Sequence, residues 1–182
     1  MEKQLFKFTY SFLNLNRFIL FLLIAFPITI KFYSIPHDDF PIINFLLGSI
    51  GAISLICWLY AVGHKANEIN ISQGITINSF KYFNLSILIL VVAYSLVMFL
   101  GTTIHDNLGS IKISYNSPIY LSIVFLCAFL ITTVIAGKVL VSAESNKVVG
   151  ISKYFTTTLQ LLIAPIGLWF IQPRMKYLNN SN

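Results

Sequence analysis

The sequence predicts an all-α, polytopic membrane helix bundle, and three observations support this fold class. First, 57% of the 182 residues are hydrophobic and 10% are charged, whereas soluble domains average about 45–50% apolar and 25% charged residues. Second, long apolar runs alternate with short polar connections. Third, lysine and arginine collect in every other connection. We expect one integral membrane domain over residues 1–178, with a disordered tail over 179–182.

The first predicted membrane span covers residues 18–34. It follows Lys3, Lys7 and Arg17, and Lys31 near its far end can extend to the headgroups. The arrangement is similar to a signal peptide, but no small-x-small cleavage site follows the apolar run. We therefore expect an uncleaved first span.

Three further spans are predicted over residues 42–63, 83–104 and 119–141. Each run is long enough to cross about 30 Å of hydrocarbon as a helix. Pro41 and Pro118 directly precede the second and fourth spans, which is the position that proline favours at a helix start. These runs define the helical bundle.

The connections carry weak strand patterns. In "EINISQGITINS", Ile69 and Ile71 alternate with polar residues, as do Ile75 and Ile77, and Gln73-Gly74 between them could form a turn. This pattern predicts either a short β-hairpin or an irregular loop. The next connection contains "SIKISY", which alternates in the same way.

The C-terminal apolar segment, residues 154–171, has two alternative topologies. Pro165 removes a backbone hydrogen bond and Gly167 loosens the helix further. A re-entrant or interfacial segment would also keep Arg174 and Lys176 on the basic side. These features favour that topology, while length alone favours a kinked fifth span.

Charge bias predicts the orientation. Eight Lys and Arg residues fall on the side of the N-terminus, and two fall on the other side. Because basic loops face the cytoplasm, we expect a multi-pass protein of a bacterial cytoplasmic membrane with a cytoplasmic N-terminus. The net charge of +6 is then explained by orientation and anionic lipid, rather than by nucleic acid.

Two motifs resemble a family of small uncharacterised bacterial multi-pass membrane proteins. The chain contains "CWLYAVGHKAN", which is similar to the family's W-[IL]-Y-x-[IV]-G pattern, and "PIGLWFIQPRMKYL", which is similar to its closing P-I-G-[IL]-W-x-[IL]-Q-P-[KR] pattern. Where the family tends to carry an acidic, aromatic run, this chain has "YFTTTLQLLIA". The resemblance covers about residues 50–178 and implies a membrane protein of similar topology. It supplies no catalytic residues to carry over. The motif residues are Trp58, Tyr60, Gly63, Pro165, Ile166, Gly167, Trp169, Gln172, Pro173 and Arg174.

Histidines and aspartates recur in the two connections expected on the outer face. His37, Asp38 and Asp39 lie in the first of them, and His105 and Asp106 lie in the other. Imidazole and carboxylate groups bind divalent metals such as zinc. They therefore form a candidate metal site, although solvated loops favour the same residue types and no other cofactor is indicated.

Small residues recur every fourth position in two spans. Gly48 and Ala52 lie in the second span, and Ala128, Thr132 and Ala136 lie in the fourth. Such stripes let helix backbones approach closely in lipid, either within one chain or between chains.

The function predicted first is non-enzymatic packing against a protein partner, a second copy of the chain or lipid. An outer-face metal enzyme or carrier, using the histidines and aspartates, is the alternative. A passive pore is a third possibility, for which Thr132, Thr133, Thr156 and Gln160 are the polar candidates. Ionisable residues are missing from the middle of spans two to four, which disfavours ion-coupled transport.

Overall fold

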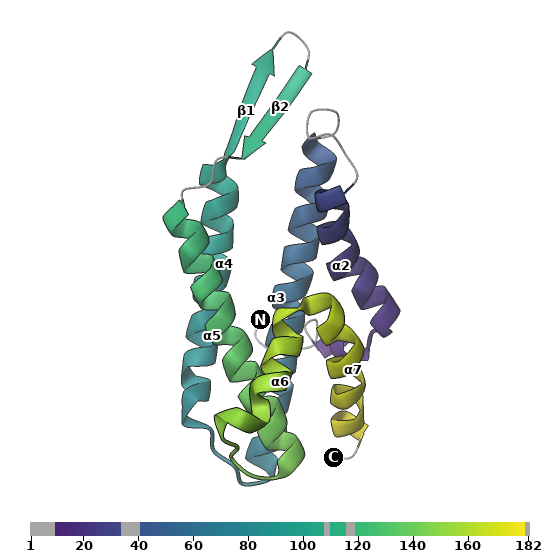
Figure 1. The fold of residues 1–182 in the computed structure, drawn as a ribbon, viewed down its shortest axis with the longest axis vertical. Coiled ribbons are helices and arrows are strands. Elements are labelled where there is room, and N and C mark those ends of the chain that lie inside the picture. The colour runs from purple at the N-terminus through teal and green to yellow at the C-terminus, as the bar shows by residue number, and fades with distance from the viewer. Residues whose placement is uncertain (1–9, 34–40, 108–109, 116–118, 181–182) are drawn as a thin grey trace.

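The computed structural model describes residues 10–33, 41–107, 110–115 and 119–180, and describes only the backbone at 26–33, 41–45, 101–107, 110–115, 165 and 179–180. Residues 10–14 are helical and precede the first labelled helix. The elements that follow are α2 Arg17–Tyr33, α3 Pro41–Ser72, the short 3-10 helix η1 Asn78–Phe80, α4 Lys81–Gly101, β1 Thr102–Asn107, β2 Ser110–Tyr115, α5 Ile119–Ser145, α6 Ile151–Leu162 and α7 Ala164–Asn180 (Figure 1).

The long helices form two antiparallel pairs. Helix α2 packs along α3, and α4 packs along α5, while α3 also contacts α5. Figure 1 shows that the two pairs diverge toward the β-hairpin and come together at the opposite end, where α6 and α7 pack on them. The bundle is therefore joined mainly at one end.

Three described helices are long and apolar enough to cross a membrane, and the bent pair α6–α7 makes a fourth candidate if it counts as one span. The three candidates are Leu46–Ser72, Asn78–Leu100 and Ile119–Ser145. This confirms a helical bundle of the membrane type. Helix α2 covers most of the first predicted span but has 17 residues, the short limit for a crossing, and is not among these candidates. The predicted count of four spans therefore stays a prediction.

Helix α3 continues past the predicted end of the second span at Gly63 and reaches Ser72. The β-hairpin considered for residues 69–77 is therefore wrong. Ile69 is 3% exposed and Ile71 is 63% exposed, so the alternation reflects two faces of one helix. The helix ends before Gly74, whose φ of 74° lies in the left-handed region that glycine adopts without strain.

The predicted end of the third span at Ile104 is also wrong. Helix α4 ends at Gly101, and β1 begins at Thr102. Strands β1 and β2 pair antiparallel, with Thr102 opposite Tyr115. The alternating "SIKISY" segment is thus strand β2. Its partner β1 begins with β-branched residues, which favour extended pairing, and α4 therefore ends where β1 begins.

The C-terminal apolar segment is not one helix, because the chain turns by 120° between α6 and α7. We call these two helices the C-terminal helical hairpin. The turn is at Ile163, whose φ of −94° and ψ of 75° leave the helical region. Pro165 occupies the first turn of α7, where a missing N–H costs nothing. Figure 1 shows α6 and α7 running in opposite directions, so both free ends lie near the same end of the bundle.

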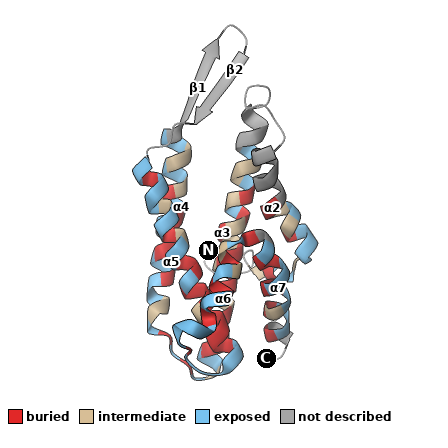
Figure 2. Cartoon of the chain, viewed as in Figure 1, coloured by how far each residue is buried: buried red, intermediate tan, exposed pale blue. Residues whose placement is uncertain are grey.

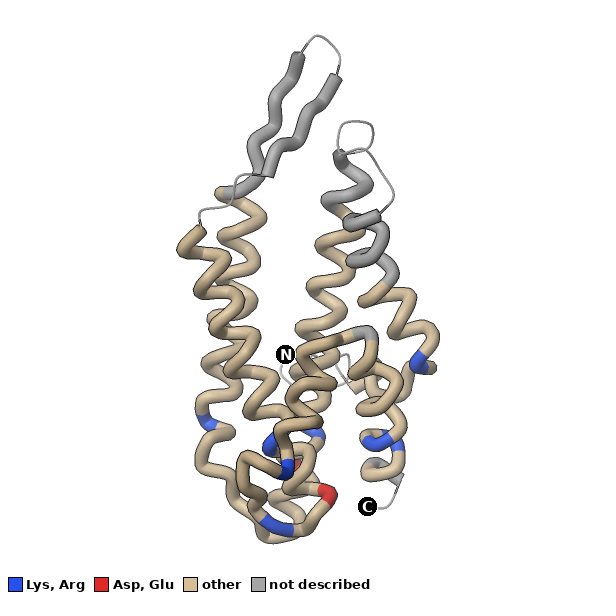
Figure 3. Tube along the Cα trace, in the orientation of Figure 1, with Lys and Arg blue, Asp and Glu red and all other residues tan. Residues whose placement is uncertain are grey.

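Buried residues and charges concentrate at that joined end. Figure 2 shows most of the buried residues there, where the N-terminal segment, α3, α5, α6 and α7 share one apolar core. Among the residues whose side chains are described, Figure 3 shows the lysines, arginines and glutamates in the same half of the molecule. The opposite half of α4 and α5 is apolar and exposed.

Candidate functional site

The C-terminal helical hairpin is attached to the bundle by one buried amide, Gln172 of α7, which is 1% exposed. Trp58 of α3 donates its indole N–H to Gln172 Oε1 at 3.1 Å. The amide nitrogen of Gln172 lies 3.1 Å from the carbonyl oxygen of Phe12, 2.5 Å from that of Leu13 and 3.3 Å from that of Leu15. One side chain therefore links α3, α7 and the N-terminal segment.

The acceptors of Gln172 follow from local structure. The carbonyls in the last turn of a helix have no partner within the helix, and residues 10–14 form such a turn. Phe12 and Leu13 are themselves buried, at 9% and 6% exposed, so water has little access to this part of the chain. Gln172 thus supplies donors where a buried helix end needs them.

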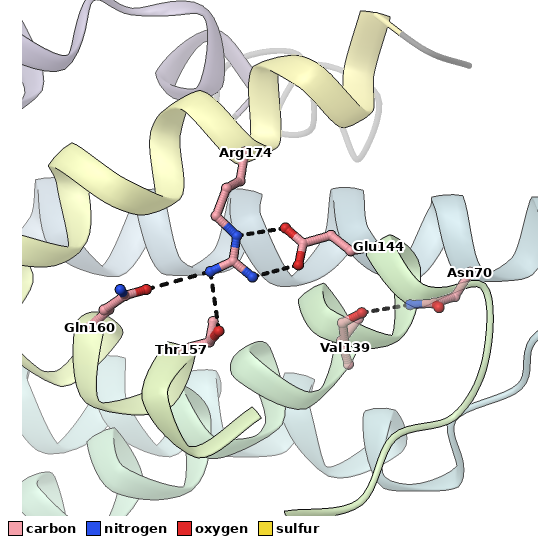
Figure 4. Close-up of polar contacts among 6 residues, drawn as sticks. All are labelled: Asn70, Val139, Glu144, Thr157, Gln160 and Arg174. Carbon is pink, nitrogen blue, oxygen red and sulfur yellow. Dashed lines mark hydrogen bonds and ion pairs between the residues drawn. The ribbon is translucent and has the colours of Figure 1, made fainter. Parts of the chain in front are cut away.

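A second polar contact fixes the hairpin to α5. Arg174 donates from Nε to Glu144 Oε1 at 2.6 Å and from Nη2 to Glu144 Oε2 at 2.5 Å. Its Nη1 lies 3.1 Å from Thr157 Oγ1 and 3.4 Å from Gln160 Oε1 of α6. Figure 4 shows the guanidinium lying between these groups. Such a two-pronged ion pair fixes orientation as well as distance.

The same end of α3 is bound to α5 through side-chain amides. Asn70 is fully buried and donates to the carbonyl of Val139 at 2.8 Å (Figure 4) and to that of Ala66 at 2.9 Å. Gln73 donates to the carbonyl of Ala143 at 3.2 Å. These bonds hold the part of α3 that extends beyond the predicted span.

The N-terminal segment also has a polar contact with α3. The Tyr10 hydroxyl donates to Glu68 Oε1, and Lys65 pairs with Glu68 Oε2 at 3.3 Å. Lys65 also lies over the Tyr10 ring, at 5.7 Å. Burial, followed by the hydrogen bond to Glu68 and its charge, raises the pKa of Tyr10. Tyr10 is therefore a hydrogen-bond donor at neutral pH.

Several residues of the two family-like motifs occupy helix contacts. Trp58 and Gln172, one from each motif, are bonded to each other. A Cβ at Gly63 would overlap the Phe83 ring, and a Cβ at Gly167 would overlap the carbonyl oxygen of Gln160. Both glycines thus allow close approach of neighbouring segments.

The remaining motif residues have varied surroundings. The Tyr60 ring lies 4.2 Å from the ring of His64. Trp169 is 39% exposed and lies against Arg17 at the start of α2. Pro173 lies inside α7 and is exposed.

The predicted small-residue stripe of α5 packs inside the chain. Ala128 contacts Ile56 and Leu90, and Ala136 is fully buried. The Thr132 hydroxyl lies 3.0 Å from the Ser86 hydroxyl of α4. Gly48 and Ala52 of α3 are half-buried.

The candidate metal residues cannot be placed as a site. His37, Asp38 and Asp39 lie outside the described residues. His105 and Asp106 lie in β1, where the description covers the backbone, and His105 is opposite Lys112. Within the described residues, no group of three metal-binding side chains is found. Metal binding at the outer face stays a prediction.

The four candidate pore residues are dispersed. Thr132 and Thr133 are buried, and their hydroxyls bond to Ser86 of α4 and to the Leu130 carbonyl of their own helix, respectively. Thr156 is exposed on α6, and Gln160 bonds to Arg174.

Sequence reasoning missed two partners in the site. Glu144 lies beyond the predicted end of the fourth span, and Thr157 is one of three consecutive threonines in α6. The sequence offered two signals for this ion pair, namely Glu144 soon after the fourth predicted span and Arg174 of opposite charge near the C-terminus. Their pairing depends on the turn at Ile163, whose place Pro165 and Gly167 indicate approximately but whose direction no local pattern gives.

The fold and these contacts define a helical protein of the membrane type with a C-terminal helical hairpin fixed by buried polar bonds. A scan of family models, a search of curated proteins and a search of solved structures each found no match. The resemblance based on the two motifs therefore stays a prediction.

Proposed function

We propose that the chain is a non-enzymatic integral membrane protein that acts by packing against a membrane-protein partner, a second copy of itself or lipid. The observation that supports this function is the apolar outer part of α4 and α5. In that part Phe99 is 81% exposed, Ile119 is 77% exposed and Ile123 is 54% exposed. The polar side chains of the candidate site, by contrast, are used in contacts between helices of the same chain.

The outer part of α4 and α5 differs from the rest of the bundle. On α4 the buried residues end with Ala93, and on α5 Leu121 is the one buried residue before Ala128. The two helices contact each other there, while the pair formed by α2 and α3 diverges (Figure 2). Lipid or another protein would cover this surface, and helices in lipid associate through packing.

A photo-crosslinking amino acid at Phe99 tests this surface. We expect it to give a stoichiometric protein adduct in intact membranes, either with another protein or with a second copy. The same amino acid at Phe155 of α6, which is 56% exposed and lies in the other half of the molecule, should react with lipid. Mass spectrometry identifies the adducts. Lipid adducts alone at Phe99 would contradict a protein partner on this surface and leave lipid as the ligand.

We also propose a topology in a bacterial cytoplasmic membrane. Helices α2, α3, α4 and α5 cross, the N-terminus is cytoplasmic, and the C-terminal helical hairpin enters and leaves from the cytoplasmic side. The 120° turn and the exposed apolar residues Phe155, Ile166 and Phe170 support this arrangement. An apolar outer face suits a hairpin that is embedded in one leaflet, and the basic end suits the cytoplasmic headgroups.

Reporters fused after Asn182 test the topology. Because the proposed topology places the C-terminus in the cytoplasm, a reporter that works in the cytoplasm should be active at this position. A reporter that works only in the periplasm should be inactive at the same position. A fusion within the β-hairpin connection, between Asn107 and Ser110, should give the opposite result because an odd number of crossings separates the two sites. A periplasmic C-terminus would establish the fifth span and reject the re-entrant hairpin.

A further inference from the structure

Arg17 and Trp169 form a cationic and aromatic pair at the contact between α2 and α7. The Arg17 guanidinium carbon lies 5.0 Å from the centre of the Trp169 ring, and the Phe21 ring lies 6.3 Å from the same ring. Figure 1 shows the start of α2 beside α7. Arg17 is exposed, so its charge is presented at the surface of this contact.

The charge of Arg17 is not neutralised by a described carboxylate. Within the described residues, Glu68 pairs with Lys65 and Glu144 pairs with Arg174. Arg17 is also the first residue of α2, and no acidic residue lies in the first turn of that helix. The N–H of Phe18 at this helix end is already bonded to Asn16 Oδ1, at 3.1 Å, so the guanidinium is the group that favours an anion here.

The surroundings of the pair are apolar. Phe18 and Leu22 of α2 are 57% and 43% exposed, and Ile166 and Phe170 of α7 are 46% and 55% exposed. A cation and a tryptophan on helices that carry exposed apolar side chains suit the level of a membrane where headgroups meet acyl chains. A soluble anion would use the cation and leave this apolar surface uncovered.

We propose that Arg17 and Trp169 bind the headgroup phosphate of an anionic phospholipid, whose acyl chains lie along the exposed apolar residues of α2 and α7. This site rests on the proposed function, because it requires this end of the bundle at a membrane surface. Arg17 holds the phosphate oxygens, and Trp169 orients the guanidinium and contacts the glycerol region. Trp169 thus has a role in binding lipid. The helix contacts made by the other motif residues do not account for this residue.

Quenching of Trp169 fluorescence by brominated lipids tests the proposal. Trp58 is fully buried, so changes with lipid report mainly on Trp169. In vesicles that contain brominated phosphatidylglycerol or brominated phosphatidylcholine, we expect a preference of about fivefold for phosphatidylglycerol, as one basic residue near the surface provides. Arg17→Gln should remove this preference, and Arg17→Lys should keep about half of it, because lysine retains the charge without the planar fork.

Lys81→Gln is the matched control. Lys81 is an exposed cation beside a ring, at 4.9 Å from Tyr82, but it lies at the start of α4. Its loss lowers the charge equally and should leave the preference at Trp169 unchanged. An equal loss in both glutamine variants would overturn the proposal, as would an unchanged preference in a folded Arg17→Gln protein.

Three further outcomes separate the lipid site from a site for a soluble anion and from the function on which the site rests. Excess inorganic phosphate should not abolish the preference, and if it does, a soluble anion rather than lipid occupies the site. Quenching by neither lipid in a folded protein would reject membrane insertion itself. Quenching by both lipids to the same extent rejects only the headgroup site.

Discussion

Replacing Gly167 by alanine is expected to lower the free energy of unfolding by about 1–3 kcal/mol, the range for overpacking a close contact. A Cβ at this position would overlap the carbonyl oxygen of Gln160 and lie 3.0 Å from its carbonyl carbon. Both atoms are backbone, and Ile163 alone separates α6 from α7, so the helices cannot move apart cheaply. Unfolding in mixed micelles, followed by circular dichroism, measures the change.

Gly150→Ala is the matched control for this substitution. Gly150 precedes α6 with a φ of −80°, which alanine also adopts, and nothing lies within 4 Å of a Cβ there. We expect a cost below about 1 kcal/mol, from a weaker helix cap. Equal effects of the two substitutions would show that α6 and α7 do not pack as closely as described.

Replacing Gln172 by leucine is expected to cost about 2–4 kcal/mol, because several buried groups lose their partner at once. The Trp58 N–H would lose its acceptor, and the carbonyls of Phe12 and Leu13 would lose their donor. The N-terminal segment should then become cleavable by protease before the bundle unfolds. Stability measurements and limited proteolysis together distinguish local release from global loss.

Two further variants test the origin of that cost. Trp58→Phe removes the indole donor, so the double variant with Gln172→Leu should be more stable than additivity predicts. Gln160→Leu, which loses a 3.4 Å contact with Arg174, should cost less than about 1 kcal/mol. Strict additivity of the first pair would contradict a shared polar contact.

The sequence predicted the helices better than their ends. Uncharged apolar runs identify the cores of α3, α4 and α5, because a membrane helix requires such runs. The ends depend on tertiary contacts instead. Helix α3 continues to Ser72 because Asn70 bonds to α5 and Ile69 enters the core, and neither contact is visible in a local pattern.

The predicted strands show a similar limit of local sequence patterns. Alternation occurs in both "EINISQGITINS" and "SIKISY", and only the second segment is a strand. A pattern of period two cannot separate a strand from a helix with one buried and one exposed isoleucine. The two segments differ because α3 continues into the first of them, as far as Ser72.

The candidate site was predictable in its parts and not as a whole. Pro165 and Gly167 indicated a break near the correct place, and the motif residues Trp58 and Gln172 were singled out separately. Their mutual bond, and the pairing of Arg174 with Glu144, arise only when the turn at Ile163 brings α7 back to α3 and α5. Such contacts are set by topology rather than by spacing in the sequence.

The bond from Gln172 to the carbonyl of Phe12 spans 160 positions and has a consequence for biogenesis. At a synthesis rate of about 5–20 residues per second, roughly ten to thirty seconds separate the emergence of these two residues from the ribosome. During that interval the first helical turn is inserted without its final donors and must rely on water, lipid headgroups or the translocation machinery. The N-terminal segment can therefore take its final position only after α7 has been synthesised.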